Sequence, residues 1–329
     1  MRIAVIGCGS IGRRHLRNLL AEGKHELSAY DPSDDAISYL TKVLKIEPCQ
    51  RLEQLWERRP EAALICATPD VHVELALAAA RQGAHLFIEK PLSHRLEGLS
   101  PLEAAIREKR LVTMVGSNMR FHPGPAAVKR FLLAGVIGAV ISARIQTGSY
   151  LPDWRPATDY RKSYTADPAK GGGALLDCIH EIDLALWYFG PASVAAAITV
   201  PAQRLQIPVE GLAEILLQHS SGVLSSVHLN FMQRDYRRSC QIVGEKGTIY
   251  WDFENPYVEV RSGTGLEKRQ ALPAEWQVND MYVEEVRHFV NCIERGEPCE
   301  APLEQGIAAL RVALQARELA SGAAASSSA

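Results

Sequence analysis

The sequence lacks the cysteine pattern of a disulfide-stapled or zinc-bound domain. It contains seven cysteines, an odd number, and no two of them form a C-x-x-C pair. This usage argues against a disulfide framework and against a structural zinc site, so we expect no metal. Buried, reduced thiols are typical of the cytoplasm, which is the compartment that the sequence predicts.

Long apolar runs and runs of one charge are also missing. No uninterrupted apolar segment reaches the ~20 residues that cross a bilayer, so no membrane partner is expected. The formal net charge is -2 and Lys and Arg do not cluster, which leaves no basic surface for nucleic acid. The 329 residues, 47% of them hydrophobic, suffice for two domains with substantial cores.

Short apolar strands alternate with helices in the first part of the chain. The expected strands are residues 2–6, 26–30, 62–67, 85–89 and 112–116. The helices expected around and between them are residues 10–22, 71–82 and 96–108. Strands that alternate with helices form βαβ units and a parallel sheet, so we predict an α/β domain over residues 1–120.

The pattern changes after residue 120. Strand-like runs follow one another between residues 193 and 261 with short breaks that contain Gly, and this predicts an open antiparallel sheet. Further elements are expected at residues 124–134, 140–147, 174–189, 279–294 and 303–320. We therefore predict an α+β domain over residues 121–321. Residues 322–329 have nothing to bury and are predicted to be disordered.

A glycine-rich turn follows the first predicted strand. Gly7, Gly9 and Gly12, with Ser10 and Ile11 between the last two, match G-x-G-x-x-G. In such a turn the first glycine permits the tight bend and the second lets the backbone approach a pyrophosphate. The third glycine allows close packing of the helix, whose N-terminus offers free N–H donors to the anion. The motif predicts a dinucleotide site.

An acidic residue completes this fingerprint. Asp31 ends the next predicted strand, nineteen residues after Gly12. Its carboxylate would bind the ribose hydroxyls and repel a 2′-phosphate, which favours NAD over NADP. Arg13 and Arg14 weaken the preference, because either could face a phosphate.

Two more loops follow predicted strands and so lie at the expected cofactor edge of the sheet. Thr68 and Pro69 follow one strand and open the helix that carries His72. Glu89 and Lys90 follow the next one, and Pro91 restricts the backbone there. Ligands of open parallel sheets bind beyond the carboxyl ends of the strands, so position rather than residue type makes these residues candidates. His72 is better explained as a helix-start residue without chemistry, although its position makes it a candidate for the cofactor.

The segment GGGALLDCIHEIDLALWYFG, residues 171–190, combines four ionisable side chains with an apolar run. As one helix it would bury an apolar stripe and turn Asp177, His180 and Glu181 toward a wetter face. The three glycines would let its N-terminus approach a ligand closely. Such a face suits either plain solvation or a cleft in which protons move.

These motifs occur in one order along nearly the whole chain, with Asn118-Met119-Arg120-Phe121 between the loops and the helix. The set resembles the glucose–fructose oxidoreductase/inositol dehydrogenase (Gfo/Idh/MocA) family. The resemblance implies an N-terminal Rossmann domain, a C-terminal domain for substrate binding and oligomerisation, and a homodimer or homotetramer. It also implies an oxidoreductase that exchanges a hydride between nicotinamide and a hydroxyl or carbonyl carbon of a sugar, cyclitol or sugar acid.

The family's catalytic residues correspond to Lys90, Asp177 and His180. The commoner family pattern separates Asp and His by four residues, whereas here the separation is three, in a D-x-x-H-E-x-D form. His180 suits acid–base work near neutral pH, and Asp177 could orient its imidazole. Lys90 could polarise the reacting oxygen, or act as the base if burial lowers its pKa. Asp183 could bind substrate or cap a neighbouring backbone.

A polar, aromatic loop supplies further candidates for substrate binding. Trp154, Arg155 and Arg161 lie in it, and aromatic rings with guanidinium groups suit a sugar that bears an acid. Arg120 competes for the role of binding that acid. A surface loop or an oligomer contact explains the same residues equally well.

Two other functions stay open at this point. A non-catalytic, NAD-binding regulator could share the fold, although Lys90 and His180 argue against it and no DNA-binding segment is visible. A reductase of a non-carbohydrate substrate is the second, because fold and cofactor do not fix the substrate.

Overall fold

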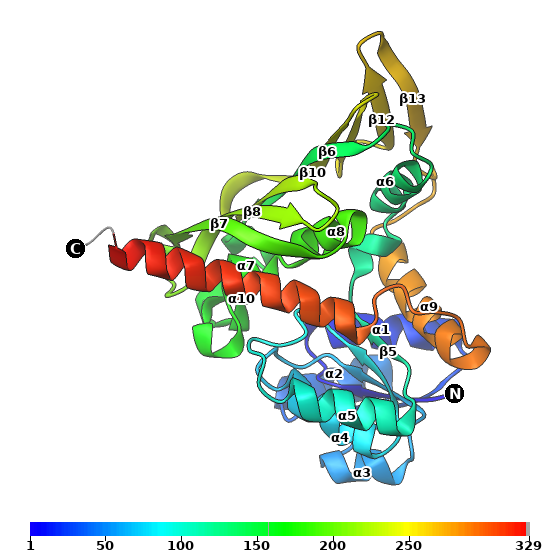
Figure 1. The fold of residues 1–329 in the computed structure, drawn as a ribbon. Coiled ribbons are helices and arrows are strands. Elements are labelled where there is room, and N and C mark those ends of the chain that lie inside the picture. Colours follow the sequence, from blue (N-terminus) through cyan, green and yellow to red (C-terminus); the bar gives the residue numbers. More distant parts are fainter. Residues whose placement is uncertain (157, 327–329) are drawn as a thin grey trace. The chain divides into compact units, whose positions relative to one another are not determined.

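The computed structural model describes residues 1–156 and 158–326 of the chain (Figure 1). These residues divide into two compact units. Unit 1 contains Met1–Ser117 and Tyr282–Ile307, and unit 2 contains Asn118–Met281 and the chain from Ala308 onward. The units differ in two respects from the predicted domain ranges: the first boundary lies after Ser117 instead of residue 120, and the segment Tyr282–Ile307 belongs to unit 1.

Unit 1 is built on a five-stranded parallel sheet in the order β2-β1-β3-β4-β5. Its strands are β1 (Arg2–Ile6), β2 (Glu26–Tyr30), β3 (Ala62–Ile65), β4 (His85–Ile88) and β5 (Thr113–Val115). Its helices include α1 (Ser10–Glu22), α4 (His72–Arg81), α5 (Leu99–Lys109) and most of α9 (Asp280–Arg295). All four residues of β3 are buried, as expected for a parallel strand covered on both faces.

The connection between β2 and β3 contains structure that the sequence pattern did not reveal. It holds α2 (Asp34–Tyr39), a π-helical turn (Leu40–Leu44) and α3 (Leu52–Glu57). Each of these elements spans only five or six residues, too few for a helical period to emerge.

Unit 2 is built on an eight-stranded sheet in the order β13-β12-β11-β10-β6-β9-β8-β7. The strands are β6 (Val140–Tyr150), β7 (Ala192–Pro201), β8 (Glu210–His219), β9 (Leu224–Asn230), β10 (Met232–Gly244), β11 (Thr248–Asp252), β12 (Tyr257–Ser262) and β13 (Gly265–Ala271). The sheet is antiparallel as predicted except at one pair, because β6 and β9 run parallel. A long connection with two helices and two strands separates them in the chain, and a hairpin does not join them.

Helices cover one face of this sheet. α7 (Ala174–Asp177) packs on β8 and β9, α8 (His180–Phe189) on β9 and β6, and α6 (Pro123–Leu133) on β11 and β12. Buried and exposed residues alternate along β8, so the other face is open. The unit also contains the 3₁₀ turns Asn118–Phe121, Leu151–Trp154, Tyr160–Lys162, Tyr164–Ala166, Pro168–Lys170 and Gln203–Leu205.

Helix α10 (Leu303–Ser326) closes the described chain. The helix includes the first five residues of the tail that was predicted to be disordered from residue 322. The alanines of this segment have the highest intrinsic helix propensity, which explains the extension. The last three residues of the predicted tail lie outside the described residues.

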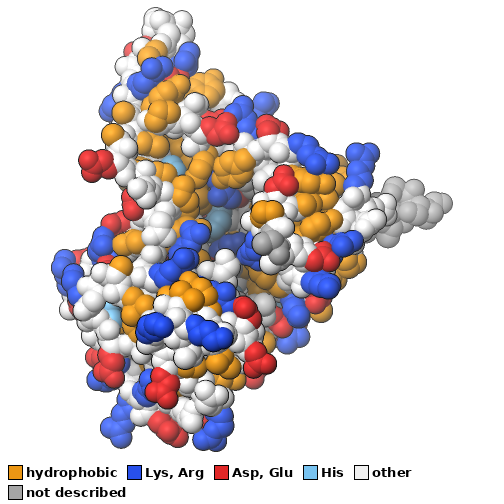
Figure 2. Space-filling model, turned by 180° about the vertical axis from the view of Figure 1, so that it is seen from behind, with side chains coloured by type: hydrophobic (Ala, Val, Ile, Leu, Met, Phe, Trp, Pro, Cys, Tyr) orange, Lys and Arg blue, Asp and Glu red, His pale blue; other side chains and the backbone are white. Residues whose placement is uncertain are grey.

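None of the described helices combines the length and the apolarity that a bilayer crossing requires. Basic and acidic side chains are interspersed over the face shown in Figure 2, in keeping with the small net charge.

Candidate active site

The glycine-rich turn of unit 1 has the backbone that its motif predicts. Gly7 has φ +91°, and a Cβ there would stand 2.4 Å from the Ala67 nitrogen. A Cβ on Gly12 would stand 2.0 Å from the Gly7 carbonyl oxygen. A Cβ on Gly9 would meet no atom of the described residues within 4 Å. Gly7 and Gly12 are therefore required by the fold, whereas Gly9 leaves room beside the start of α1.

Asp31 is anchored beneath this turn. Its Oδ2 accepts a hydrogen bond from the Cys8 N–H at 2.6 Å, and its Oδ1 accepts one from the Ser33 N–H at 2.8 Å. The arginines that could have favoured a 2′-phosphate have other partners. Arg13 donates to Asp35 at 2.5 Å, and Arg14 lies over the Tyr282 ring at 4.2 Å. These contacts favour NAD over its phosphorylated form.

The remaining cofactor candidates lie on the loops after β3 and β4, which neighbour β1 in the sheet. Thr68 and Pro69 stand between β3 and α4. His72, 1% exposed, places its two ring nitrogens 2.9 Å from the Ala67 carbonyl and 3.0 Å from the Pro91 carbonyl. Burial lowers the pKa of His72. This imidazole therefore joins the two loops, and its contact with a cofactor stays a prediction.

Lys90 follows β4 and is half-buried. The backbone N–H of Lys90 donates a hydrogen bond to the Glu89 carboxylate at 3.1 Å. The other oxygen of Glu89 lies 2.7 Å from Nε2 of His15 on α1. Sequence reasoning missed His15, although it lies three residues after Gly12 and four before Leu19, on the buried stripe of α1. A histidine on such a stripe was the available signal.

The polar segment of unit 2 is not one amphipathic helix. The chain leaves helical geometry at Cys178, so α7 ends at Asp177 and α8 begins at His180. The expected wet face is also wrong, because the three carboxylates and the imidazole of the segment are each 7% exposed or less. A buried carboxylate needs a partner, and the sequence pattern could not show where the partners come from.

Each carboxylate of the segment has such a partner. Asp177 accepts hydrogen bonds from the hydroxyls of Tyr164 and Thr165 at 2.9 and 2.7 Å. Glu181, fully buried, pairs with the Nε of Arg238 on β10 at 2.8 Å.

Arg120 and Asp183, both proposed from sequence to touch substrate, bind one another. The guanidinium donates through Nε at 2.9 Å and through Nη2 at 2.5 Å to the two carboxylate oxygens. Both residues are buried, and the Arg120 guanidinium also lies 5.4 Å from the Trp187 ring centre. This bidentate pair fixes the start of unit 2 to α8, and a role in substrate binding stays a prediction.

A protein side chain occupies the space beside the glycines that precede α7. A Cβ on Gly173 would stand 2.3 Å from Oε1 of Glu210, and that oxygen accepts the Leu175 N–H at 3.2 Å. Arg317 of α10 donates to the same oxygen at 2.9 Å. The expected approach of a ligand to this helix start is therefore replaced by a glutamate cap.

The candidate side chains of the aromatic loop are exposed, and two of them contact other residues of the chain. Trp154 donates to Ser149 at 2.7 Å and meets the Phe231 ring edge-on at 5.2 Å. Arg161 donates to Asp159 at 2.9 Å, while Arg155 is exposed.

Both units contain segments that match models of known protein families. Residues 1–117 match the model described as "Oxidoreductase family, NAD-binding Rossmann fold", and residues 126–250 match the GFO/IDH/MocA C-terminal domain. Myo-inositol 2-dehydrogenase of Thermotoga maritima is 26% identical over 97% of this chain and 96% of its own length. The scyllo-inositol 2-dehydrogenase (NAD(+)) of Bacillus subtilis is 25% identical over 90% of this chain and 87% of its own.

Solved structures agree in fold. A levoglucosan dehydrogenase in complex with NADH superimposes with a TM-score of 0.88 at 20% identity, covering 98% of this chain and 97% of that one. The predictions of fold class, oxidoreductase family and NAD are confirmed. The chain belongs to the Gfo/Idh/MocA family of NAD-dependent oxidoreductases.

Proposed function

We propose that this protein is a dehydrogenase or reductase that transfers a hydride between NAD and a hydroxyl or carbonyl carbon of a sugar, cyclitol or sugar acid. One observation carries the proposal: the family match covers both units, and Lys90 and His180 stand in the motifs of the two units. The relatives at 25% and 26% identity are named as inositol dehydrogenases, which makes cyclitols the first substrates to test.

The turn between β1 and α1 fits a dinucleotide. Gly9 leaves space beside the first N–H groups of α1, and Asp31 is held where its strand ends. The residues assigned to the cofactor are Gly7, Gly9, Ser10, Ile11, Gly12, Asp31, Thr68, Pro69, His72, Glu89 and Lys90. Bound NAD would supply the hydride acceptor. The other tasks belong to protein side chains.

His180 is assigned the proton transfer. An imidazole can take the proton of a hydroxyl group in one direction and return it in the other, because its pKa lies near neutrality. Lys90 is assigned the donation of a hydrogen bond to the reacting oxygen, which stabilises developing negative charge there. Asp177 is assigned the orientation of His180, since its own carboxylate is fixed by two hydroxyls.

The substrate's other groups are assigned to Arg120, Trp154, Arg155, Arg161 and Asp183. Arg120 and Arg161 already bind carboxylates of the chain. An acidic substrate would therefore be recognised first by the exposed Arg155, with the Trp154 ring offering an apolar surface to the sugar.

A single assay tests the assignment. The purified protein is mixed with NAD and a panel of cyclitols, neutral sugars, uronic acids and nonulosonic acids, and NADH absorbance is followed. We expect His180→Ala to lower kcat at least about 100-fold, the scale of a lost general base, with the Kd of NADH unchanged.

His25→Ala is the matched control. His25 precedes β2, at the edge of the parallel sheet opposite the cofactor loops, and its removal should leave kcat unchanged. Near-normal turnover of His180→Ala would refute the assignment of His180. NADH binding without turnover on any substrate would favour the regulator of the same fold.

We also propose that the chain forms a homodimer or homotetramer through the open face of the unit 2 sheet. Four large aliphatic side chains are exposed on it among the described residues, namely Ile198, Val200, Leu216 and Leu224. Exposed apolar patches of this kind commonly mark a contact with another protein.

A further inference from the structure

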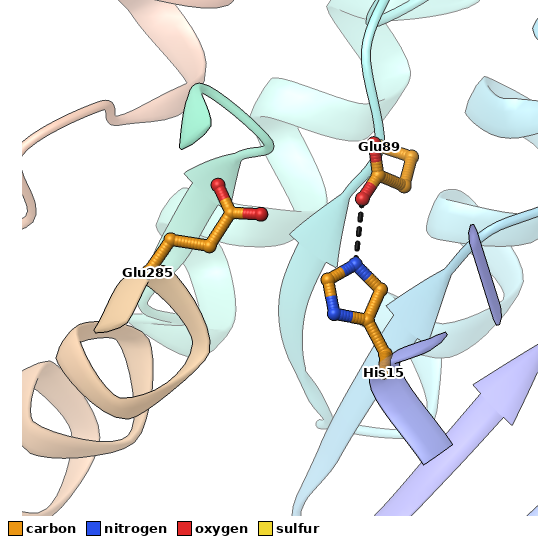
Figure 3. Close-up of side chains that lie close together, drawn as sticks. All are labelled: His15, Glu89 and Glu285. Atoms are coloured by element: carbon orange, nitrogen blue, oxygen red, sulfur yellow. Dashed lines mark hydrogen bonds and ion pairs between the residues drawn. The ribbon is translucent and has the colours of Figure 1, made fainter. Parts of the chain in front are cut away.

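Three ionisable side chains meet inside unit 1, and one of them, Glu89, directly precedes Lys90. Figure 3 shows His15 from α1, Glu89 from the end of β4 and Glu285 from α9. They are 0%, 6% and 1% exposed, and one ligand atom of each lies within 4.8 Å of the others. We call these three residues the buried triad.

His15 and Glu89 are in direct contact within the triad, and the distance between them shows whether a proton or a metal ion joins them. His15 Nε2 and Glu89 Oε1 are 2.7 Å apart, which is a hydrogen-bond distance. Two ligands on one divalent cation, each about 2.0–2.2 Å from it, would stand roughly 3 Å apart or more. The contact therefore holds a proton between the two side chains. Among the described residues, Glu285 Oε2 has no hydrogen-bond partner although it is buried.

Two buried carboxylates at this separation cannot both be charged. Burial, reinforced by the negative charge of Glu89, raises the pKa of Glu285 well above its usual value, which favours the neutral acid form of Glu285. Burial opposes the ionisation of Glu89 as well. There, the hydrogen bond from His15 and the charge of Lys90 outweigh it and lower the pKa, so Glu89 is an anion. The triad's carboxylates thus carry one negative charge.

That charge adjoins the backbone of Lys90. Glu89 Oε2 accepts a hydrogen bond from the backbone N–H of Lys90, and Gly116, where a Cβ would stand only 3.0 Å from the same oxygen, confines the carboxylate on one side. The positive charge of the Lys90 side chain is close enough to lower the pKa of Glu89. Other ionisable groups act on the triad too. Tyr282, itself under the Arg14 guanidinium, interacts with both glutamates, as does the buried thiol of Cys66, and Glu89 acts on His72.

We propose that the buried triad keeps Lys90 protonated, so that Lys90 donates a hydrogen bond to the reacting oxygen and the proton transfer falls to His180. His15 and Glu285 are positioning residues in this arrangement. His15 holds Glu89 as an anion, and Glu285 stays neutral so that the charge remains on Glu89. The proposal rests on the proposed function, because it explains the division of labour between Lys90 and His180.

The protonation of Lys90 can be measured without turnover. The full-length protein is labelled with formaldehyde and cyanoborohydride across a pH series, and the rate at Lys90 is read from peptide masses. Only the neutral amine reacts, so the rate reports the pKa of this lysine. We expect Glu89→Gln to lower that pKa by about one unit or more, the usual effect of losing an adjacent opposite charge.

Two variants decide where the charge resides. Glu285→Gln copies a neutral acid and should leave the Lys90 titration as in the wild type, as should the exposed control Glu74→Gln on α4. A lowered pKa in Glu285→Gln would overturn the proposal, and so would an unchanged one in Glu89→Gln. The infrared band of a protonated carboxyl group should vanish in Glu285→Gln and persist in Glu89→Gln. A band that persists in Glu285→Gln and vanishes in Glu89→Gln would also overturn the proposal.

His15 provides a test if Glu89→Gln fails to fold. His15→Leu removes the donor to Glu89, so Glu89 should take up a proton and the Lys90 pKa should fall. His15→Gln, which can still donate an N–H, should restore it. If both variants titrate alike, His15 has no positioning role. If the wild-type titration shifts on dialysis against EDTA, a bound cation replaces the shared proton and the proposal is wrong.

Failure of this inference and failure of the proposed function are distinguishable. The labelling result needs no substrate, so it can hold even if His180→Ala retains full activity. Conversely, activity lost in His180→Ala with no labelling shift in Glu89→Gln would leave the enzyme in place and remove only the triad's role.

Discussion

His122 is an imidazole enclosed by aromatic rings. It caps α6, where its Nδ1 accepts the Gly124 N–H at 3.0 Å, and it is fully buried. The ring centres of Trp276 and Phe253 lie 4.3 and 5.1 Å away. Burial and the neighbouring Arg238 lower its pKa to about 3. The folded protein therefore keeps His122 neutral at pH values where an unfolded chain would protonate it.

This difference makes stability depend on pH. In the unfolded chain the pKa of this histidine is about 6.5. Below that pH the unfolded state binds a proton that the folded state does not bind, so the free energy of unfolding falls as pH falls. The expected contribution is about 1.4 kcal/mol per pH unit between roughly pH 6 and pH 4. His122→Asn keeps an N-cap oxygen but cannot titrate. Urea unfolding across this range should show a shallower slope for the variant, and parallel curves would contradict the expectation.

At the scale of elements, the turn before α7 shows how one backbone conformation serves several contacts. Gly173 has φ +107°, and the Glu210 carboxylate occupies the space where a Cβ would stand. The same carboxylate caps α7 and binds Arg317. A side chain at position 173 would have two effects: it would strain the backbone, and it would displace the Glu210 carboxylate.

Gly173→Ala is expected to lower the free energy of unfolding by about 3 kcal/mol or more, since strain at positive φ costs about 1–3 kcal/mol and the cap is lost besides. Gly222→Ala is the matched control, because Gly222 has φ +86° with no atom near its Cβ. The control should show the cost of strain alone. Chemical unfolding of both variants measures the difference, and equal losses would mean that the Glu210 contact contributes nothing.

Sequence was informative where a local pattern carries the structure. The predicted strand 2–6, helix 10–22 and strand 26–30 coincide with β1, α1 and β2, because a buried parallel strand and a glycine motif are both local signals. The break at Cys178 was missed for the opposite reason. The segment is apolar enough to read as one helix, and the carboxylates' partners come from elsewhere in the chain.

Distance along the chain limited the prediction of the site. Arg238 lies 57 residues from Glu181, and Glu285 lies far from Glu89 in sequence, so no spacing could pair them. The residues that a motif aligns, such as Gly7, Gly12 and Asp31, adopt the geometry expected of them. Buried charges thus depend on tertiary partners, and these become visible only once the sheet order is known.

At the scale of the whole molecule, the open face of unit 2 is the surface that most needs an explanation. Leu216 is 36% exposed on β8, with Ala196 of β7 and Ser226 of β9 beside it in register. Ile198 and Leu224 on the same face are 66% and 45% exposed. Arg144 and Gln146 of β6 continue this face, so an apolar patch adjoins a polar one. Protein interfaces commonly combine an apolar core with a polar rim in this way.

If copies of the chain meet through this face, a charge at its apolar part should separate them. We expect the wild type to sediment as a dimer or tetramer and Leu216→Arg to shift toward the monomer by at least tenfold in Kd, because a buried unpaired charge costs well over the 1.4 kcal/mol that this factor represents. Leu133→Arg is the matched control, since Leu133 is 76% exposed at the end of α6, away from the sheet. Unchanged sedimentation of Leu216→Arg would place the contact elsewhere, whereas a monomeric wild type would leave this apolar face to a different partner.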